Sequence, residues 1–192
     1  MTERLHERGF SLVEMVIISA LVVIVAGIGM PLFNDISNSI KLGEAGRQVE
    51  RELQSARLTA VSANQPMRVR FNCSSAGEYR MVELIGTPSS PASADSATDR
   101  CNPANYPFPA ADRNPLTRPN NDGALRYLPS DVTFQQSATI EFWPDGTAHT
   151  AGSTTTNPWP VIPSGGTSII LLRNGKTKTI TVNGIGKVTL VQ

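Results

Sequence analysis

The sequence predicts an α+β fold in which a long N-terminal helix packs on a C-terminal antiparallel β-sheet domain. Three observations support this prediction: an uncharged apolar run from Met15 to Phe33, apolar residues that recur every three or four positions between residues 34 and 65, and alternating segments separated by turn pairs from residue 66 onward. The length of 192 residues is sufficient for one domain with a sizeable core.

The composition excludes several classes of function. Seventeen Lys and Arg residues against sixteen Asp and Glu residues give a formal net charge of +1, which argues against a strongly basic nucleic-acid coat and against an acidic tail. The hydrophobic content of 40% excludes wholesale disorder. Two cysteines and two histidines exclude a zinc-ribbon or iron–sulfur framework built by this chain alone, so we expect neither a metal site nor a cofactor.

The apolar run predicts a transmembrane first half of the helix, residues 10–33. Its nineteen uncharged residues would span about 28 Å as a helix, close to the hydrocarbon thickness of a bilayer. A buried core helix is the alternative, but a helix that is apolar on every side needs a larger protein around it. Arg4 and Arg8 precede the run, so the positive-inside tendency places the start of the chain in the cytoplasm and the bulk of it in the periplasm. Pro31 weakens the far end of this helix.

The segment ahead of the run carries a motif. Arg8-Gly9-Phe10-Ser11-Leu12-Val13-Glu14 places a glycine before the apolar residues and one carboxylate inside their first turns. With the run behind it, this string resembles the prepilin leader of type IV pilins and pseudopilins. The resemblance implies that a prepilin peptidase removes the leader, residues 1–9, by cutting between Gly9 and Phe10, and then methylates Phe10.

The same resemblance implies that Glu14 acts in assembly. It would be the fifth residue of the mature chain and would neutralise the terminal amine of a neighbouring subunit. A carboxylate near a bilayer is costly unless it finds a partner of this kind. In the alternative interpretation, Glu14 lies at the headgroup level and is simply solvated. A cleaved secretory signal and a permanent signal anchor compete with the prepilin interpretation of the whole N-terminal segment.

Residues 34–65 predict an amphipathic continuation of the helix into the globular domain. One side should pack on a sheet while the other, which carries Arg47, Glu50 and Arg51, stays in water. The Gln65-Pro66 pair ends the helix. The apolar positions expected to face the sheet are Ile36, Ile40, Leu42, Ala45, Val49, Leu53, Ala56 and Ala60.

Residues 66–192 predict a periplasmic β-domain. In its first strand, Met67, Val69, Phe71 and Cys73 alternate with polar residues that include Arg68, which indicates a half-buried strand. Asn174-Gly175 is a strong signal for a two-residue hairpin turn. The other strands are expected at residues 79–85, 132–134, 139–143, 168–172, 176–182 and 185–191.

A long Pro- and Ser-rich loop interrupts this pattern at residues 86–123. It holds seven of the fourteen prolines and shows no periodicity, so it is either a functional surface loop or a disordered insertion. Cys101 lies inside it, and Cys73 ends the first strand. A disulfide between these two cysteines would suit an oxidising periplasm and would contribute roughly 3–4 kcal/mol.

Three later segments narrow the resemblance. Glu50 to Ala60 resembles the helix that enters the sheet in the GspH/FimT group, Phe142 to Ala148 resembles its F-x-P-x-G turn, and Ile180 to Val188 resembles its closing strand. The group includes minor pseudopilins of type II secretion systems and FimT-like minor pilins of type IV pili. The resemblance implies the following partners: the prepilin peptidase, other major and minor pilins or pseudopilins, an inner-membrane assembly platform and the lipid bilayer.

The sequence lacks the common catalytic motifs. The sequence has no G-x-S-x-G, P-loop, H-E-x-x-H or C-x-x-C. His149 would be the single histidine of the mature chain, and a lone histidine in a Gly/Thr-rich segment is usually a surface residue. Asp145, in Pro-Asp-Gly, is better explained as a turn former. We therefore expect no enzymatic activity.

DNA binding is the weaker functional alternative. FimT-like proteins that bind DNA carry a C-terminal G-R-x-R pattern, whereas this chain has Gly186-Lys187-Val188-Thr189, in which half of that charge is missing. Trp143 and Trp159 could stack on bases, although packing is the more common role of such residues. The candidate phosphate contacts are Arg173, Lys176, Lys178 and Lys187.

The sequence as a whole predicts a minor pilin or pseudopilin subunit. It would reside in the inner membrane as a single-pass protein with its C-terminal domain in the periplasm, and then enter a type IV pilus or type II secretion pseudopilus that it helps to initiate or cap. The rivals are a FimT-like DNA-binding minor pilin for DNA uptake and a periplasmic binding domain held by a simple signal anchor.

Overall fold

The chain is represented by a computed structural model. It describes residues 11–85, 95, 97–109, 120–151 and 159–191, with only the backbone described at 28–32. The chain divides into two compact units, Met1–Ser39 and Ile40–Gln192.

One helix, α1 (Leu12–Ala63), contributes to both units and contains 52 residues. It continues through Pro31, where the sequence indicated a weak point. Asn64 follows the helix with φ of 51°, a left-handed conformation that commonly stops a helix at this position. The helix therefore ends at Ala63, three positions before Pro66, as the Gln65-Pro66 pair predicts.

Within the second unit, α1 buries one stripe. Ile36, which belongs to the first unit, and Ile40 were expected to begin this stripe. They are 51% and 64% exposed, so the prediction was wrong at these two positions. From Leu42 onward it is confirmed, and several small residues in the stripe allow the sheet to approach the helix closely. At Gly46, for example, an added Cβ would lie 2.9 Å from Leu190 Cδ1. The buried helix residues are Leu42, Ala45, Val49, Leu53, Ala56 and Ala60.

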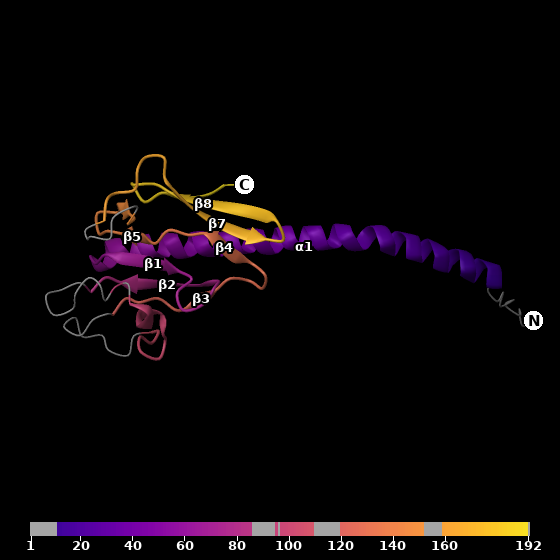
Figure 1. Ribbon diagram of the computed structural model, residues 1–192, viewed down its shortest axis with the longest axis horizontal. Coiled ribbons are helices and arrows are strands. Elements are labelled where there is room, and N and C mark those ends of the chain that lie inside the picture. Colours follow the sequence, from indigo (N-terminus) through magenta and orange to yellow (C-terminus); the bar gives the residue numbers. More distant parts are fainter. Residues whose placement is uncertain (1–10, 86–94, 96, 110–119, 152–158, 192) are drawn as a thin grey trace, which may run out of the picture. The chain divides into compact units, whose positions relative to one another are not determined.

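The β-domain contains two antiparallel sheets. The five-stranded sheet has the order β3-β2-β1-β5-β6, and the four-stranded sheet has the order β4-β7-β8-β9. Figure 1 shows the strands of both sheets alongside the C-terminal part of α1, with which they share one hydrophobic core. The strands are β1 (Met67–Phe71), β2 (Glu78–Glu83), β3 (Arg126–Tyr127), β4 (Thr133–Gln136), β5 (Ile140–Phe142), β6 (Ala148–His149), β7 (Thr167–Arg173), β8 (Lys176–Val182) and β9 (Val188–Val191).

Aromatic side chains join the two sheets. Phe134 of β4 lies with its ring centroid 5.0 Å from that of Phe71 on β1 and 5.9 Å from that of Tyr79 on β2. Such tilted and edge-on pairs stabilise a core beyond the area they bury. The α+β fold with a long N-terminal helix on an antiparallel β-domain is thus confirmed, with two sheets rather than one.

The second face of the five-stranded sheet differs from the expectation of a half-buried strand. Arg68 on β1 is 1% exposed and forms an ion pair with Glu141, its cross-strand neighbour on β5, which is also 1% exposed. The Trp159 ring lies 4.2 Å from the Arg68 guanidinium carbon. The alternation of β1 is therefore real, but its polar face is covered by charged partners instead of water.

Part of the 86–123 segment provides this cover. It contains the short 3-10 helix η2 (Thr98–Cys101), in which Arg100 is fully buried and donates to Glu83 O at 2.7 Å and to Asp122 Oδ1 at 2.9 Å. Arg80 of β2 donates to Gly123 O at 2.8 Å and Arg100 O at 3.0 Å. The described part of the segment is therefore pinned to the sheet by two buried guanidinium groups.

The disulfide is the covalent part of this attachment. Cys73 and Cys101 are bridged, with Cα atoms 5.5 Å apart. The sequence placed Cys73 at the end of the first strand, which was wrong. Strand β1 stops at Phe71 because Asn72 adopts a left-handed φ of 49°. The bridge therefore connects the turn after β1 to the end of η2.

Candidate functional site

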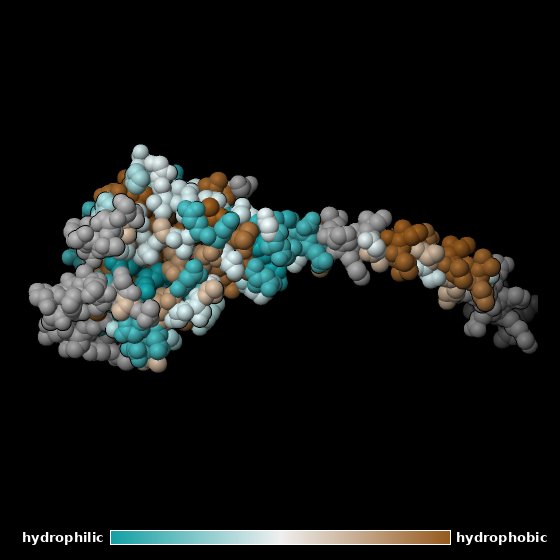
Figure 2. Space-filling view, in the orientation of Figure 1, coloured by the Kyte–Doolittle hydropathy of each residue, from teal (hydrophilic) through white to brown (hydrophobic). Residues whose placement is uncertain are grey.

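The N-terminal part of α1 is an exposed apolar surface. The consecutive residues Leu21, Val22, Val23 and Ile24 are 58%, 61%, 70% and 58% exposed, and because each residue turns the helix by about 100°, they point to all sides of it. Figure 2 shows this part of the helix in brown. We call residues 12–27 the apolar segment. Its exposed large residues are Leu12, Val13, Met15, Val16, Ile17, Ile18, Leu21, Val22, Val23, Ile24 and Val25.

The apolar segment is a large reservoir of burial free energy. Fully burying one such side chain stabilises by about 1.5–3 kcal/mol, so covering these half-exposed residues would contribute on the order of 10 kcal/mol. A monomeric soluble protein rarely leaves a surface of this kind uncovered. The segment is therefore suited to another apolar environment, whether lipid or other helices.

Membrane crossing is a separate question. None of the helices in the described part of the chain has both the length and the apolar character that a bilayer crossing requires. The transmembrane assignment of residues 10–33 is therefore not confirmed. Gly9 and Phe10, the predicted processing site, lie outside the described residues.

Glu14 is the one acidic residue within the first turn of α1. Its side chain is exposed among apolar neighbours. A carboxylate at this position interacts favourably with the positive end of the helix dipole, which is a local reason for its presence. The same exposure leaves the carboxylate accessible to a cation from outside the chain.

The three segments that resemble the GspH/FimT group meet at one residue, Arg57 of α1. Its guanidinium donates to Gly146 O at 3.2 Å in the β5–β6 turn and to Ile185 O at 3.1 Å in the β8–β9 turn. Gly186 has φ of 73°, and a Cβ there would lie 2.4 Å from Gly146 O and 2.6 Å from Arg57 Nε. Gly186 is thus required by the close approach of its turn to Gly146 and Arg57, whereas Gly146 is required by its own φ of 84°.

The turn that contains Asp145 also orders His149. The Thr147 hydroxyl lies 2.6 Å from Asp145 Oδ1 and 2.8 Å from His149 Nε2, and His149 Nδ1 lies 2.8 Å from Trp159 O. Hydrogen bonds from the Thr147 hydroxyl and amide lower the pKa of Asp145. Asp145 is therefore a turn former, as predicted, whereas His149 is buried rather than on the surface.

The two tryptophans are already engaged in packing. The Trp143 ring stacks on His149 with centroids 4.7 Å apart, and the Trp159 ring lies against the Arg68 guanidinium. One face of each ring is therefore occupied by a partner within the chain.

The four basic residues proposed for DNA contact do not form one patch. Arg173 is 5% exposed, donates to Ser130 O and lies 3.3 Å from Asp131 Oδ2, so its assignment as a phosphate contact is wrong. Lys176 and Lys178 are half-buried on β8, and Lys178 packs near Gly46 of α1. Lys187 is exposed beyond the other end of β8, which is roughly 20 Å long.

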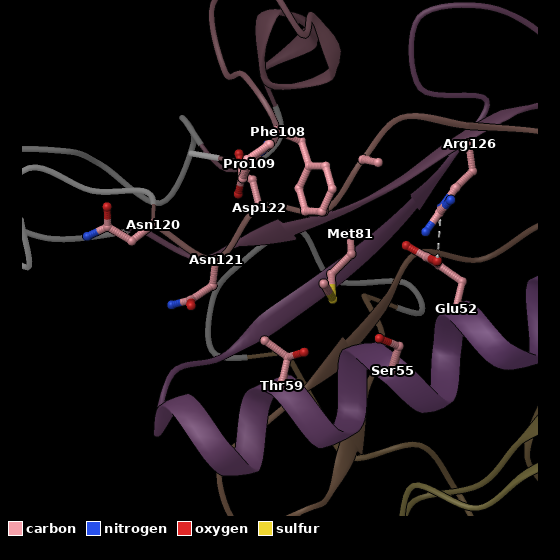
Figure 3. Close-up of a pocket in the computed structure, with 12 residues that line it drawn as sticks. Glu52, Ser55, Thr59, Met81, Phe108, Pro109, Asn120, Asn121, Asp122 and Arg126 are labelled. Atoms are coloured by element: carbon pink, nitrogen blue, oxygen red, sulfur yellow. Dashed lines mark ion pairs between the residues drawn. The ribbon is translucent and has the colours of Figure 1, made fainter. Parts of the chain in front are cut away.

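A cavity of about 300 Å³ lies at the β2–β3 edge of the five-stranded sheet, between the sheet and α1. Sequence reasoning missed it because its residues are distant along the chain and form no motif. In Figure 3, the Phe108 ring and Met81 lie across the cavity from Ser55 and Thr59 of α1. Glu52 and Arg126 form an ion pair at one end, with Glu52 Oε2 3.5 Å from Arg126 Nε. Among the described residues, no cluster of three or more His, Cys, Asp or Glu side chains is placed to hold a metal ion.

Comparison with known proteins gives a limited result. No family model and no curated protein matches the chain. Two crystal structures of the type IV minor pilin FimU from Pseudomonas aeruginosa strain PAO1 are similar to it. The P21 form has 13% identity and a TM-score of 0.46, covering 82% of this chain and 92% of that chain. The P65 form has 13% identity and a TM-score of 0.44, covering 79% and 93%. Because the identity is only 13%, the similarity concerns the fold and carries no statement about function.

Proposed function

We propose that this chain is a non-enzymatic minor pilin or pseudopilin subunit. The observation that carries the proposal is the apolar segment, which is exposed around the helix and directly follows the Gly9-Phe10 leader motif. A prepilin peptidase would cut between these two residues. The apolar segment would first hold the subunit in the inner membrane and would then pack among the equivalent helices of a type IV pilus or type II secretion pseudopilus.

The apolar segment and the β-domain would have different roles in assembly. The apolar segment supplies the association free energy, which is non-directional and therefore does not by itself set a register. Glu14 would set the register, because a carboxylate in an apolar assembly is favourable only where a cation meets it. The β-domain would face outward and contact other major and minor subunits while the filament is initiated or capped.

The first experiment is the intact mass and N-terminal sequence of the protein extracted from native membranes. We expect a chain that starts at methylated Phe10. A chain that starts at Met1 would favour a simple signal anchor, and one that starts near Met30 would indicate a secreted β-domain; either result would refute the proposal.

A second experiment tests the role of Glu14. Glu14→Gln keeps the shape of the side chain and removes its charge, and Glu44→Gln is the matched control because Glu44 is also exposed on α1. We expect Glu14→Gln to abolish incorporation into filaments, measured by blotting sheared filament fractions, without changing leader removal. Equal incorporation of both variants would overturn the register role.

A further inference from the structure

The charge balance of the β2–β3 cavity is incomplete. The Glu52 side chain is 12% exposed, and its ion-pair contact with Arg126 is 3.5 Å long. The Arg126 side chain is 50% exposed, so much of its charge is directed to water rather than to Glu52. Burial raises the pKa of Glu52 more strongly than Arg126 lowers it. A buried carboxylate with weak compensation is costly to the chain on its own.

The other groups of the cavity indicate what would complete it. Ser55 and Thr59 are one helical turn apart on α1 and present hydroxyl groups, which can accept hydrogen bonds. Phe108 is 57% exposed although it lines the cavity, so its ring is open to a ligand. Figure 3 shows this ring facing the cavity, with the hydroxyls on the opposite side and Glu52 at the end.

We propose that this cavity is a binding site for a guanidinium group. A guanidinium is planar, carries five N–H donors and no acceptor, and combines pairing to a carboxylate with stacking on an aromatic ring. It would lie between Phe108 and the helix, donate to Glu52, and donate its remaining hydrogens to Ser55 and Thr59. The volume of about 300 Å³ suits one side chain or small cation rather than a folded partner.

Two sources could supply this chemistry: an arginine side chain of another protein, or a free small guanidinium compound. The site lies wholly within the second unit, so its occupation does not depend on leader cleavage or on filament assembly. Failure of the pilin proposal would therefore leave this proposal standing, and the reverse also holds.

The test titrates the full chain in detergent with Nα-acetyl-arginine amide and follows the ¹³C-methyl signal of Met81, which lines the cavity. We expect saturable shifts. Nα-acetyl-citrulline amide, which has nearly the same shape without the charge, should give none. Glu52→Gln should weaken binding by about tenfold or more, in the range measured for hydrogen bonds to charged groups. Phe108→Leu should weaken it less, and the control Glu44→Gln should leave it unchanged.

A second readout separates a binding residue from a merely structural one. Because the pKa of Glu52 is raised in the folded chain, the folded state holds its proton to higher pH than the unfolded state, and the empty protein loses stability as the pH rises through that range. Glu52→Gln should therefore stabilise the empty protein at neutral pH while it weakens binding by about tenfold or more. A variant that is destabilised would show Glu52 to be structural and would overturn the proposal.

The source is identified by photo-crosslinking in cells from p-benzoylphenylalanine at Ser55. A captured peptide with arginine at the contact assigns the site to a protein partner, and binding of the free probe without any adduct assigns it to a small guanidinium compound. Both results support the site. Equal shifts with arginine and citrulline amides, or no shift with either, would overturn it. Arg113 and Arg118 lie outside the described residues, and each carries a guanidinium group of this same chain. If the arginine probe bound only after both were replaced by Gln, the proposal of a ligand from outside the chain would also be overturned.

Discussion

Alanine substitution of four glycines separates backbone conformation from steric contact in the β-domain. Gly165 has neither constraint, since it has no positive φ and nothing lies within 4 Å of an added Cβ. Gly175 has φ of 77° but open space around it. Gly184 has no positive φ, yet an added Cβ there would lie 2.3 Å from Ile162 O. Gly186 combines both constraints: its φ is 73°, and an added Cβ would lie 2.4 Å from Gly146 O and 2.6 Å from Arg57 Nε.

The expected costs follow from these two factors. Gly165→Ala should be neutral or stabilise by up to about 1 kcal/mol through the unfolded state. Gly175→Ala should cost about 1–2 kcal/mol for a left-handed alanine. Gly184→Ala should cost at least about 1–3 kcal/mol, because the Ile162 backbone is held by its amide hydrogen bond to Ala148 O at 2.9 Å and cannot move freely. Gly186→Ala should cost roughly the sum of the last two, about 2–5 kcal/mol.

The assay is urea unfolding of the full chain in detergent, followed by tryptophan fluorescence. Both tryptophans, Trp143 and Trp159, lie in the β-domain and report on it. A Gly186→Ala variant no less stable than Gly175→Ala would refute the reasoning, because it would mean that Arg57 and the β5–β6 turn do not hold their positions. Equal losses for Gly165→Ala and Gly184→Ala would refute the steric argument.

Three further predictions concern polar groups of the β-domain. Glu141→Gln should cost about 3–5 kcal/mol of unfolding free energy, because it leaves the buried Arg68 charge without its carboxylate. The Arg68→Met/Glu141→Leu double variant should be near neutral, because it removes both charges. Additive losses in the double-mutant cycle would contradict this expectation. Tyr79→Phe should stabilise by about 1 kcal/mol, since the buried hydroxyl has no hydrogen-bond partner among the described residues, and a loss in urea unfolding would show that a partner exists. The pKa of Asp145 is lowered in the folded chain, so its carboxylate stabilises the fold at pH values above its pKa in the unfolded chain, and this stabilisation is lost as the pH falls through its pKa in the folded chain. Asp145→Asn should therefore flatten the acid branch of the curve of stability against pH. Identical acid branches for the two proteins would exclude this contribution.

The sequence predicted the fold well where the pattern is long and local. The stripe from Leu42 to Ala60 and the β7–β8 hairpin at Asn174-Gly175 are both present. The two-residue strands β3 and β6 are too short to show any period, so no pattern could indicate them. The burial of Arg68 was missed for a different reason: alternation shows that two faces differ, but it does not show what covers each face.

The candidate sites illustrate the same limit. A motif along the chain, such as Gly9-Phe10 with Glu14, is visible in the sequence, but its chemistry requires partners that one chain does not contain. The cavity shows the opposite case, because Glu52, Phe108 and Arg126 come together only through the sheet topology. Arg173 looked available as a cation because its partner Asp131 is 42 positions away, and only the pairing of β4 with β7 brings them into contact.

The contact between Gly46 and Leu190 has a consequence for biosynthesis. The helix stripe is made early, whereas β9, which packs on it through Leu190, is made about 140 residues later. At 5–20 residues per second, translation of the intervening chain takes on the order of 10 s, while a helix forms within about a microsecond. The part of the stripe around Gly46, which Leu190 covers, therefore stays open for that time. Ala45 and Gly46 present little apolar area there, which limits premature association before β9 is in place.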